Sequence, residues 1–129
     1  MKTLARVLPI IVGLALLGAG LLIMLNPEAA LERMALTPGG LAGLATIRSF
    51  VGGSLVGIAV FLISGAIKIH ARAMLIAGVF LGIAAIGRLF GLILDGANAT
   101  VMGPFVIEIV LVGICAFSYI TLQKHENIA

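Results

Sequence analysis

Three charged side chains inside long apolar segments are the residues of this sequence that could do chemistry. They are Arg48, Arg88 and Glu108. An arginine near the centre of a membrane span costs about 2.5–3.5 kcal/mol on insertion scales, so such residues pair with one another. The planar guanidinium binds a carboxylate through two parallel hydrogen bonds. These residues therefore predict an intramembrane ion pair, or a site for an anionic headgroup, a carboxylate or a polarisable carbonyl.

The composition predicts an integral membrane protein. Of the 129 residues, 62% are hydrophobic and 10% are charged, whereas soluble domains average about 45–50% apolar and about 25% charged residues. The net charge of +3 comes from few residues without a basic run, so it does not indicate nucleic-acid binding. The single cysteine, Cys115, excludes an internal disulfide. No cluster of Cys, His and carboxylates has metal-ligand spacing, and the sequence carries no cofactor motif.

Apolar segments of membrane-spanning length recur along the chain, since a spanning helix needs about 20 apolar residues. The predicted spans cover residues 7–25, 41–67, 73–94 and 100–122. The first is too long for the apolar core of a signal peptide, so we expect it to be retained. Asn26 and Pro27 begin a short amphipathic helix over residues 27–36. The predicted fold is all-α: an integral membrane, antiparallel four-helix transmembrane bundle. It forms a single domain over residues 1–129, with the amphipathic helix between spans one and two.

The positive charges outside the spans predict the orientation, because cytoplasmic loops carry an excess of Lys and Arg. Five of them fall on one side of the predicted spans: Lys2, Arg6, Lys68, Arg72 and Lys124. Only Arg33 falls on the other side, beside Glu28, Glu32 and Asp95. We therefore expect a multi-pass protein with both termini in the cytoplasm.

The charges within the spans share one depth. Arg48 lies about seven residues below the outer end of span two, and Arg88 lies about seven below Asp95. Glu108 lies about eight residues below the outer end of span four. At 1.5 Å per residue, each is roughly 10–12 Å under the outer surface. We expect Glu108 to pair with one or both arginines and Asp95 to cap the site from above. Secondary hydrogen bonds are expected from Thr46, Ser49 and Asn98.

Glycines spaced four residues apart let helix backbones approach closely. Such pairs occur at residues 53 and 57, 78 and 82, and 87 and 91. We interpret them as sites of close packing within the chain rather than as a dedicated dimer face. Gly52 and Gly53, one turn below Arg48, are interpreted as making space for a partner side chain or a ligand.

The segments Ile47-Arg48-Ser49-Phe50-Val51-Gly52-Gly53 and Gly87-Arg88-Leu89-Phe90-Gly91, with Asp95-Gly96 and Glu108, resemble a known family. It is a bacterial domain-of-unknown-function family of small four-helix membrane proteins, similar to the wider DoxX-like group. The resemblance covers nearly the whole chain. It implies a four-helix bundle in the bacterial inner (cytoplasmic) membrane and the residue set Arg48, Arg88, Asp95 and Glu108. It implies no activity.

Three functional hypotheses follow. The leading one is a site in the outer-leaflet half that binds a small amphiphile or anion, such as a lipid headgroup, quinone or carboxylate, for transport or sensing. Arg48 and Arg88 would hold the ligand's oxygens. Glu108 would orient the two arginines, and Asp95 would gate the mouth of the site. The alternative is a structural subunit or assembly partner of a membrane complex, in which the charges are packing staples. An enzyme with Glu108 as acid or base is least favoured, because no nucleophile, metal or cofactor motif accompanies it. Membrane lipids are the expected partners, and a homo-oligomer is an open alternative.

Overall fold

A computed structural model describes residues 1–34, 36–37, 39–96 and 99–126, and helices make up nearly all of them. The elements are α1 (Lys2–Leu25), α2 (Pro27–Met34), α3 (Leu41–Thr46), the π-helix η1 (Ile47–Gly52), α4 (Gly53–Lys68), α5 (Ala71–Leu94) and α6 (Ala99–Glu126). The described ranges contain no strand. Because α3, η1 and α4 follow one another without a break, they form one long helical segment, Leu41–Lys68. The predicted all-α class is confirmed.

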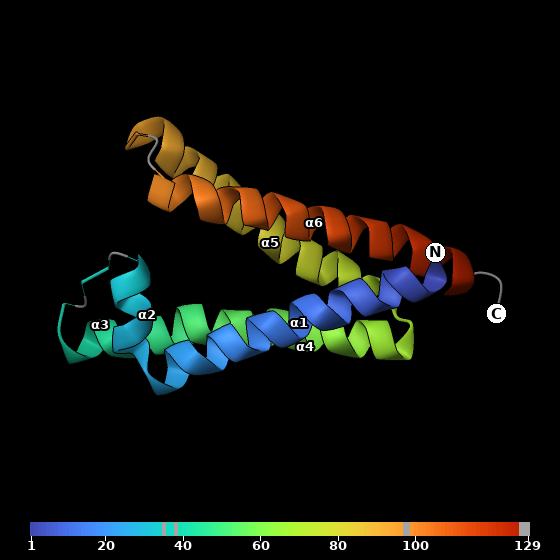
Figure 1. Ribbon diagram of the computed structural model, residues 1–129, viewed down its shortest axis with the longest axis horizontal. Coiled ribbons are helices and arrows are strands. Elements are labelled where there is room, and N and C mark those ends of the chain that lie inside the picture. Colours follow the sequence, from blue (N-terminus) through green and yellow to red (C-terminus); the bar gives the residue numbers. More distant parts are fainter. Residues whose placement is uncertain (35, 38, 97–98, 127–129) are drawn as a thin grey trace.

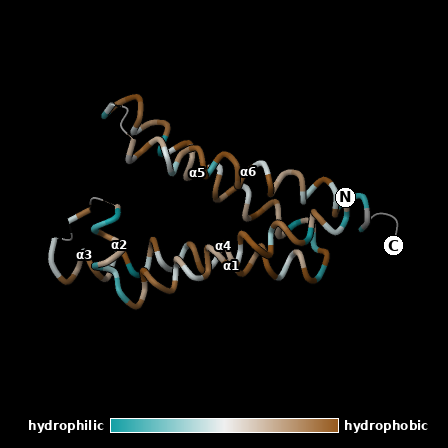
Figure 2. Tube along the Cα trace, in the orientation of Figure 1, coloured by the Kyte–Doolittle hydropathy of each residue, from teal (hydrophilic) through white to brown (hydrophobic). Residues whose placement is uncertain are grey.

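Within the described residues, four helical segments are long and apolar enough to cross a membrane. They are Lys2–Leu25, Leu41–Lys68, Ala71–Leu94 and Val101–Lys124. Apolar residues follow the helices along most of their length, and hydrophilic residues gather toward the ends (Figure 2). Many large apolar side chains point outward, among them Ile83 at 63% exposure and Ile107 at 59%. Lipid rather than water is the solvent that such a surface requires. The protein is therefore a multi-pass membrane protein.

The helices form two antiparallel pairs that meet at one end and diverge toward the other (Figure 1). α1 packs along η1 and α4, and α5 packs along α6. Contacts of α4 with α5 and of α1 with α6 join the pairs. We call the end with both termini and the α4–α5 turn the closed end. The end with α2, α3 and the turn after α5 is the splayed end (Figure 1).

Glycines bring α1 close to η1 and α4. A Cβ added at Gly13 would lie 2.6 Å from Ile63 Cγ1, and one at Gly20 would lie 2.9 Å from the carbonyl oxygen of Gly52. A Cβ at Gly52 would lie 2.6 Å from Met24 Cγ. Gly13 and Gly20 are seven residues apart and so share one face of α1. Two helices held by backbone contact need small residues where they cross.

The glycine pairs expected to pack within the chain mostly do not. Added Cβ atoms at Gly53, Gly57, Gly82 and Gly87 would meet no heavy atom of the described chain within 4 Å. Only Gly78 approaches another helix, with a Cβ position 3.0 Å from Cys115 Cβ. The interpretation of these pairs is therefore wrong except at Gly78, because spacing alone does not say which helix a glycine faces. The space expected beside Arg48 at Gly52 is taken by Met24.

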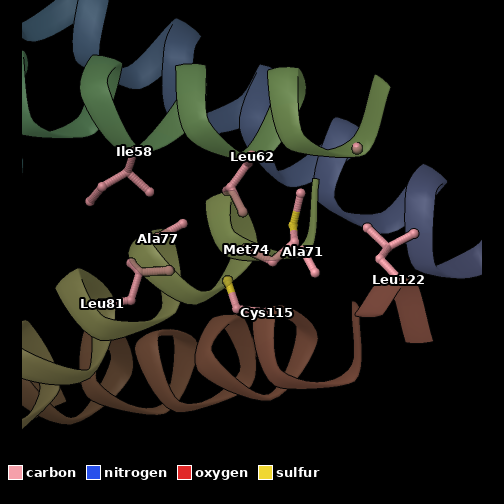
Figure 3. Packing of buried hydrophobic residues seen from close by; sticks show 9 residues of the cluster. Ile58, Leu62, Ala71, Met74, Ala77, Leu81, Cys115 and Leu122 are labelled. Atoms are coloured by element: carbon pink, nitrogen blue, oxygen red, sulfur yellow. The ribbon is translucent and has the colours of Figure 1, made fainter. Parts of the chain in front are cut away.

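The apolar core lies toward the closed end. Side chains from α4, α5 and α6 point toward one another there (Figure 3). Its buried members are Ile58, Leu62, Ala66, Ala71, Met74, Ala77, Leu81, Cys115 and Leu122. Ile10, Val12 and Leu16 of α1 pack against this cluster. The core thus joins the two helix pairs near the closed end and leaves the splayed end without equivalent packing.

Polar side chains secure the closed end by binding helix termini. Arg6 Nε donates a 3.0 Å hydrogen bond to the carbonyl oxygen of Ala66, near the end of α4. Glu126 accepts a 3.1 Å hydrogen bond from the backbone N–H of Ala71, at the start of α5, and lies 3.4 Å from His70 Nδ1. The last carbonyls and the first N–H groups of a helix lack partners within it. A positive charge stabilises the C-terminal end of a helix, and a negative charge stabilises the N-terminal end.

Candidate functional site

Arg88 and Glu108 form an ion pair between α5 and α6. Arg88 Nε donates to Glu108 Oε2 at 3.1 Å, and Nη2 donates to Oε1 at 2.9 Å. This bidentate arrangement is the strongest geometry available to a guanidinium and a carboxylate. The Arg88 side chain is 35% exposed and that of Glu108 is 15% exposed. The predicted pairing of Glu108 with an arginine is confirmed for Arg88.

Helix periodicity explains why these two side chains meet. On α6, Glu108 continues the inward stripe of Val112, Cys115 and Leu122. On α5, Arg88 lies seven residues beyond the buried Leu81 and so shares its face. Each stripe is buried in the core near the closed end. Where the two helix pairs have diverged, the same stripes are only partly covered and carry the two charges.

The ion pair uses only part of the guanidinium. An arginine has five N–H donors, and two of them serve Glu108. The remaining donors of Arg88 have no acceptor in the described part of the chain. The Arg88 side chain is about one-third exposed, so it is not fully enclosed by the chain. The pair therefore lowers the cost of the charge while leaving N–H groups free to bind an acceptor oxygen.

The structure does not bring Arg48 to this pair. Arg48 lies in η1, within the α1–α4 pair, and its side chain is exposed. It makes no ion pair or hydrogen bond with any described residue. The prediction that Glu108 pairs with one or both arginines therefore holds for Arg88 alone. π-helical segments are rare and occur often at functional sites. Because Arg48 lies in such a segment, it stays a candidate functional residue.

The hydroxyl groups near Arg48 bond to their own helix. Thr46 Oγ1 donates to the carbonyl oxygen of Ala42 at 2.9 Å, and Ser49 Oγ donates to that of Ala45 at 3.0 Å. Such back-bonding satisfies a hydroxyl in an apolar environment. Neither hydroxyl group donates a hydrogen bond to the Arg88–Glu108 pair.

Asp95 lies at the end of α5 and is exposed. Its backbone N–H donates to the carbonyl oxygen of Gly91 at 2.8 Å. Its carboxylate forms no ion pair with the residues that the structure describes, so the expected cap over the arginines does not form. Asn98, the remaining predicted site residue, lies outside the described residues.

A small cavity lies between α4 and α5, at the splayed side of the core. Its volume is about 110 Å³. Its lining residues are Ser54, Gly57, Ile58, Phe61 and Phe80. The sequence interpretation missed this cavity. The available signal was Gly57 one turn from a phenylalanine, although the spacing could not show that Phe80 of α5 faces it.

Four long apolar helices and a partly buried ion pair define this chain as a small multi-pass helical membrane protein with a charge pair within its spans. The model of one family matches residues 4–119, which include all the predicted site residues. The chain belongs to that family, described as Domain of unknown function (DUF4345). This confirms the expected membership in a domain-of-unknown-function family. Neither the curated proteins nor the solved structures contain a match.

Proposed function

We propose that this protein binds an anionic amphiphile of the bilayer at the Arg88–Glu108 pair, for transport or sensing of that molecule. The observation that carries the proposal is a bidentate ion pair that leaves Arg88 35% exposed at membrane depth. Its remaining N–H groups suit an acceptor oxygen of a headgroup. The Glu108 carboxylate would hold the guanidinium in the orientation that presents them.

Charge favours an anionic ligand over a neutral one. Arg48, Arg88 and Glu108 together carry a formal charge of +1. Arg48, which has no partner among the described residues, supplies this excess. A phosphate or carboxylate headgroup would neutralise it, whereas a quinone would not. In this proposal Arg88 binds the headgroup and Arg48 attracts it from the facing helix pair.

The same proposal includes the location of the protein. Of the Lys and Arg residues outside the predicted spans, five lie at or near the closed end and only Arg33 lies near the splayed end. By the positive-inside rule the closed end would face the cytoplasm. The splayed end, with the ion pair, would then lie in the outer-leaflet half. Following the resemblance to bacterial DoxX-like proteins, we place the protein in a bacterial cytoplasmic membrane.

A structural role is the second candidate, and the same ion pair supports it. Two hydrogen bonds between Arg88 and Glu108 join α5 to α6 toward the splayed end, where the two helix pairs diverge (Figure 1). In that case the chain would be a subunit or assembly partner of a membrane complex, and no small molecule would bind at the pair. Buried pairs often contribute little net stability compared with apolar residues, which is why we rank this role second.

Native mass spectrometry of protein extracted gently from its own membrane distinguishes the two roles. The informative variant is Arg88→Leu/Glu108→Leu, because it removes the ion pair without leaving an unpaired charge. Arg72→Leu, an exposed arginine at the closed end, is the matched control. An adduct present in wild type and Arg72→Leu but absent in the double variant supports ligand binding. A bare wild-type chain overturns it, and retained partner chains favour the structural role.

A further inference from the structure

We propose that the ligand is a long-chain amphiphile whose apolar chain enters the cavity between α4 and α5. This inference rests on the proposed function, since it places the headgroup at Arg88. It adds that a free anion is a poor ligand and that a chain is part of what the protein recognises. The cavity of about 110 Å³ is far smaller than the roughly 300–1,000 Å³ of pockets that enclose a whole drug-sized ligand. It has room for part of one chain.

The distance between the cavity and the ion pair suits such a molecule. Phe80, which lines the cavity, and Arg88 are both on α5 and are eight residues apart. At 1.5 Å per residue this is roughly 12 Å along the helix axis. A headgroup bound at Arg88 would therefore send its chain toward the closed end along α5, and the chain would reach the cavity before the core.

Small residues mark the route between the two points. Phe80 lies on the edge of α5 that faces α4, because it shares the cavity with Gly57 and Phe61. Ala84 and Gly87 follow Phe80 by four and seven residues and so lie on the same edge, next to Arg88. Added Cβ atoms at Gly57 and Gly87 would meet no heavy atom of the described chain within 4 Å. Between Phe80 and Arg88, this exposed edge of α5 therefore presents small residues along which a chain can lie.

The walls of the cavity fit a chain rather than a second polar group. Phe61 is 39% exposed and Phe80 is 57% exposed, so each presents part of a ring to the space beside Gly57. Ile58 closes the inner side, where it joins the core. Ser54 is the one polar residue among the lining residues that the structure describes. A headgroup would gain little here, whereas an apolar chain gains contacts with both rings.

Photolabelling of the full chain in nanodiscs of zwitterionic phospholipid tests this inference. The probe is dodecyl phosphate with a photoactivatable diazirine at the chain end, and peptide mass spectrometry locates the label. We expect labelling of peptides that contain Phe61 or Phe80. Gly57→Leu fills the cavity and should reduce this labelling several-fold. Gly113→Leu, an equally open glycine at a similar depth on α6, should leave it unchanged.

Two further measurements separate failure of this inference from failure of the proposed function. Equal labelling of wild type and Gly57→Leu, with probe binding still lost in Arg88→Leu/Glu108→Leu, would overturn the chain position alone. The same labelling by a zwitterionic long-chain probe would also overturn it, because bulk lipid would then explain the cavity. A wild-type protein that binds no dodecyl phosphate in native mass spectrometry would overturn both proposals.

Discussion

α1 and α4 meet through glycine, whereas α5 and α6 meet through an ion pair as well as through small residues. In the first pair, Gly20 and Gly52 place one helix against the backbone of the other. In the second pair, Gly78 makes a similar approach at Cys115 near the closed end, and Arg88 and Glu108 replace it near the splayed end. Away from the closed end, where Arg6 bonds to Ala66, the first pair shows that this chain can hold two helices together in a membrane without charge.

This difference bears on function. An ion pair at membrane depth costs desolvation that glycine packing does not. If the only requirement near the splayed end of α5 and α6 were adhesion, the arrangement of α1 and α4 would meet it. The ion pair supplies free N–H groups as well as adhesion, so we interpret it as a recognition site that also joins two helices.

The largest effect is expected where the first pair is closest. Gly20→Leu places side-chain atoms where a Cβ alone would lie 2.9 Å from the carbonyl oxygen of Gly52. The helices must separate, and we expect the free energy of unfolding to fall by about 3 kcal/mol. Gly18→Leu is the control on the same helix, because a Cβ there meets no described atom within 4 Å. Thermal unfolding in one detergent compares them, and equal melting temperatures would contradict the glycine-based packing.

Removing the ion pair should lower the free energy of unfolding by less than Gly20→Leu does, and the single and double variants should differ. Glu108→Leu leaves Arg88 without a counter-ion and should lower the free energy of unfolding by about 2 kcal/mol. This is below the usual cost of breaking a buried pair, because the partly exposed arginine can reach toward headgroups. The free energy of unfolding of Arg88→Leu/Glu108→Leu should lie within about 1 kcal/mol of the wild-type value. A double variant as unstable as Glu108→Leu would show that adhesion is the main role of the pair.

The fold was predictable from apolar length, and so was half of the site. Hydropathy placed the four spans because lipid tolerates few other patterns. Counting from the turn after α5 put Arg88 and Glu108 at one depth, and adjacent antiparallel helices then brought them together. Such counting fails for Arg48, because depth does not determine which helices are neighbours. The divergence of the two pairs depends on contacts between distant segments and has no local signal.

Which glycines pack against another helix was also not predictable from their spacing in the sequence. Spacing of four residues selected Gly53, Gly57, Gly82 and Gly87, which face open space. Gly13 and Gly20 do the packing at a spacing of seven, and that period was available in the sequence. What the sequence lacked was the identity of the facing backbone, which is set only when α1 and α4 are docked.

At the closed end, polar contacts should stabilise the two helix pairs equally, so that the pairs differ only toward the splayed end. Arg6 binds the end of α4, and Glu126 binds the start of α5. We expect Arg6→Ala and Glu126→Ala each to lower the free energy of unfolding by about 1 kcal/mol, as loss of a helix cap does. Lys124→Ala, at an exposed position, is the control. Chemical unfolding of reconstituted protein measures all three. A loss confined to one variant would mean that the pairs differ at both ends.

The smallest effect on stability is expected at Arg48, together with a clear effect on binding. Arg48 has no partner among the described residues, so Arg48→Leu should change the free energy of unfolding by less than about 0.5 kcal/mol. Native mass spectrometry should nevertheless show a weaker adduct of an anionic amphiphile, because the excess positive charge is gone. Arg33→Leu, an exposed arginine of α2, should leave the adduct intact. A marked loss of stability in Arg48→Leu would instead mean that charge holds both helix pairs. The contrast between a pair joined by glycine and a pair joined by ions would then no longer argue for a ligand.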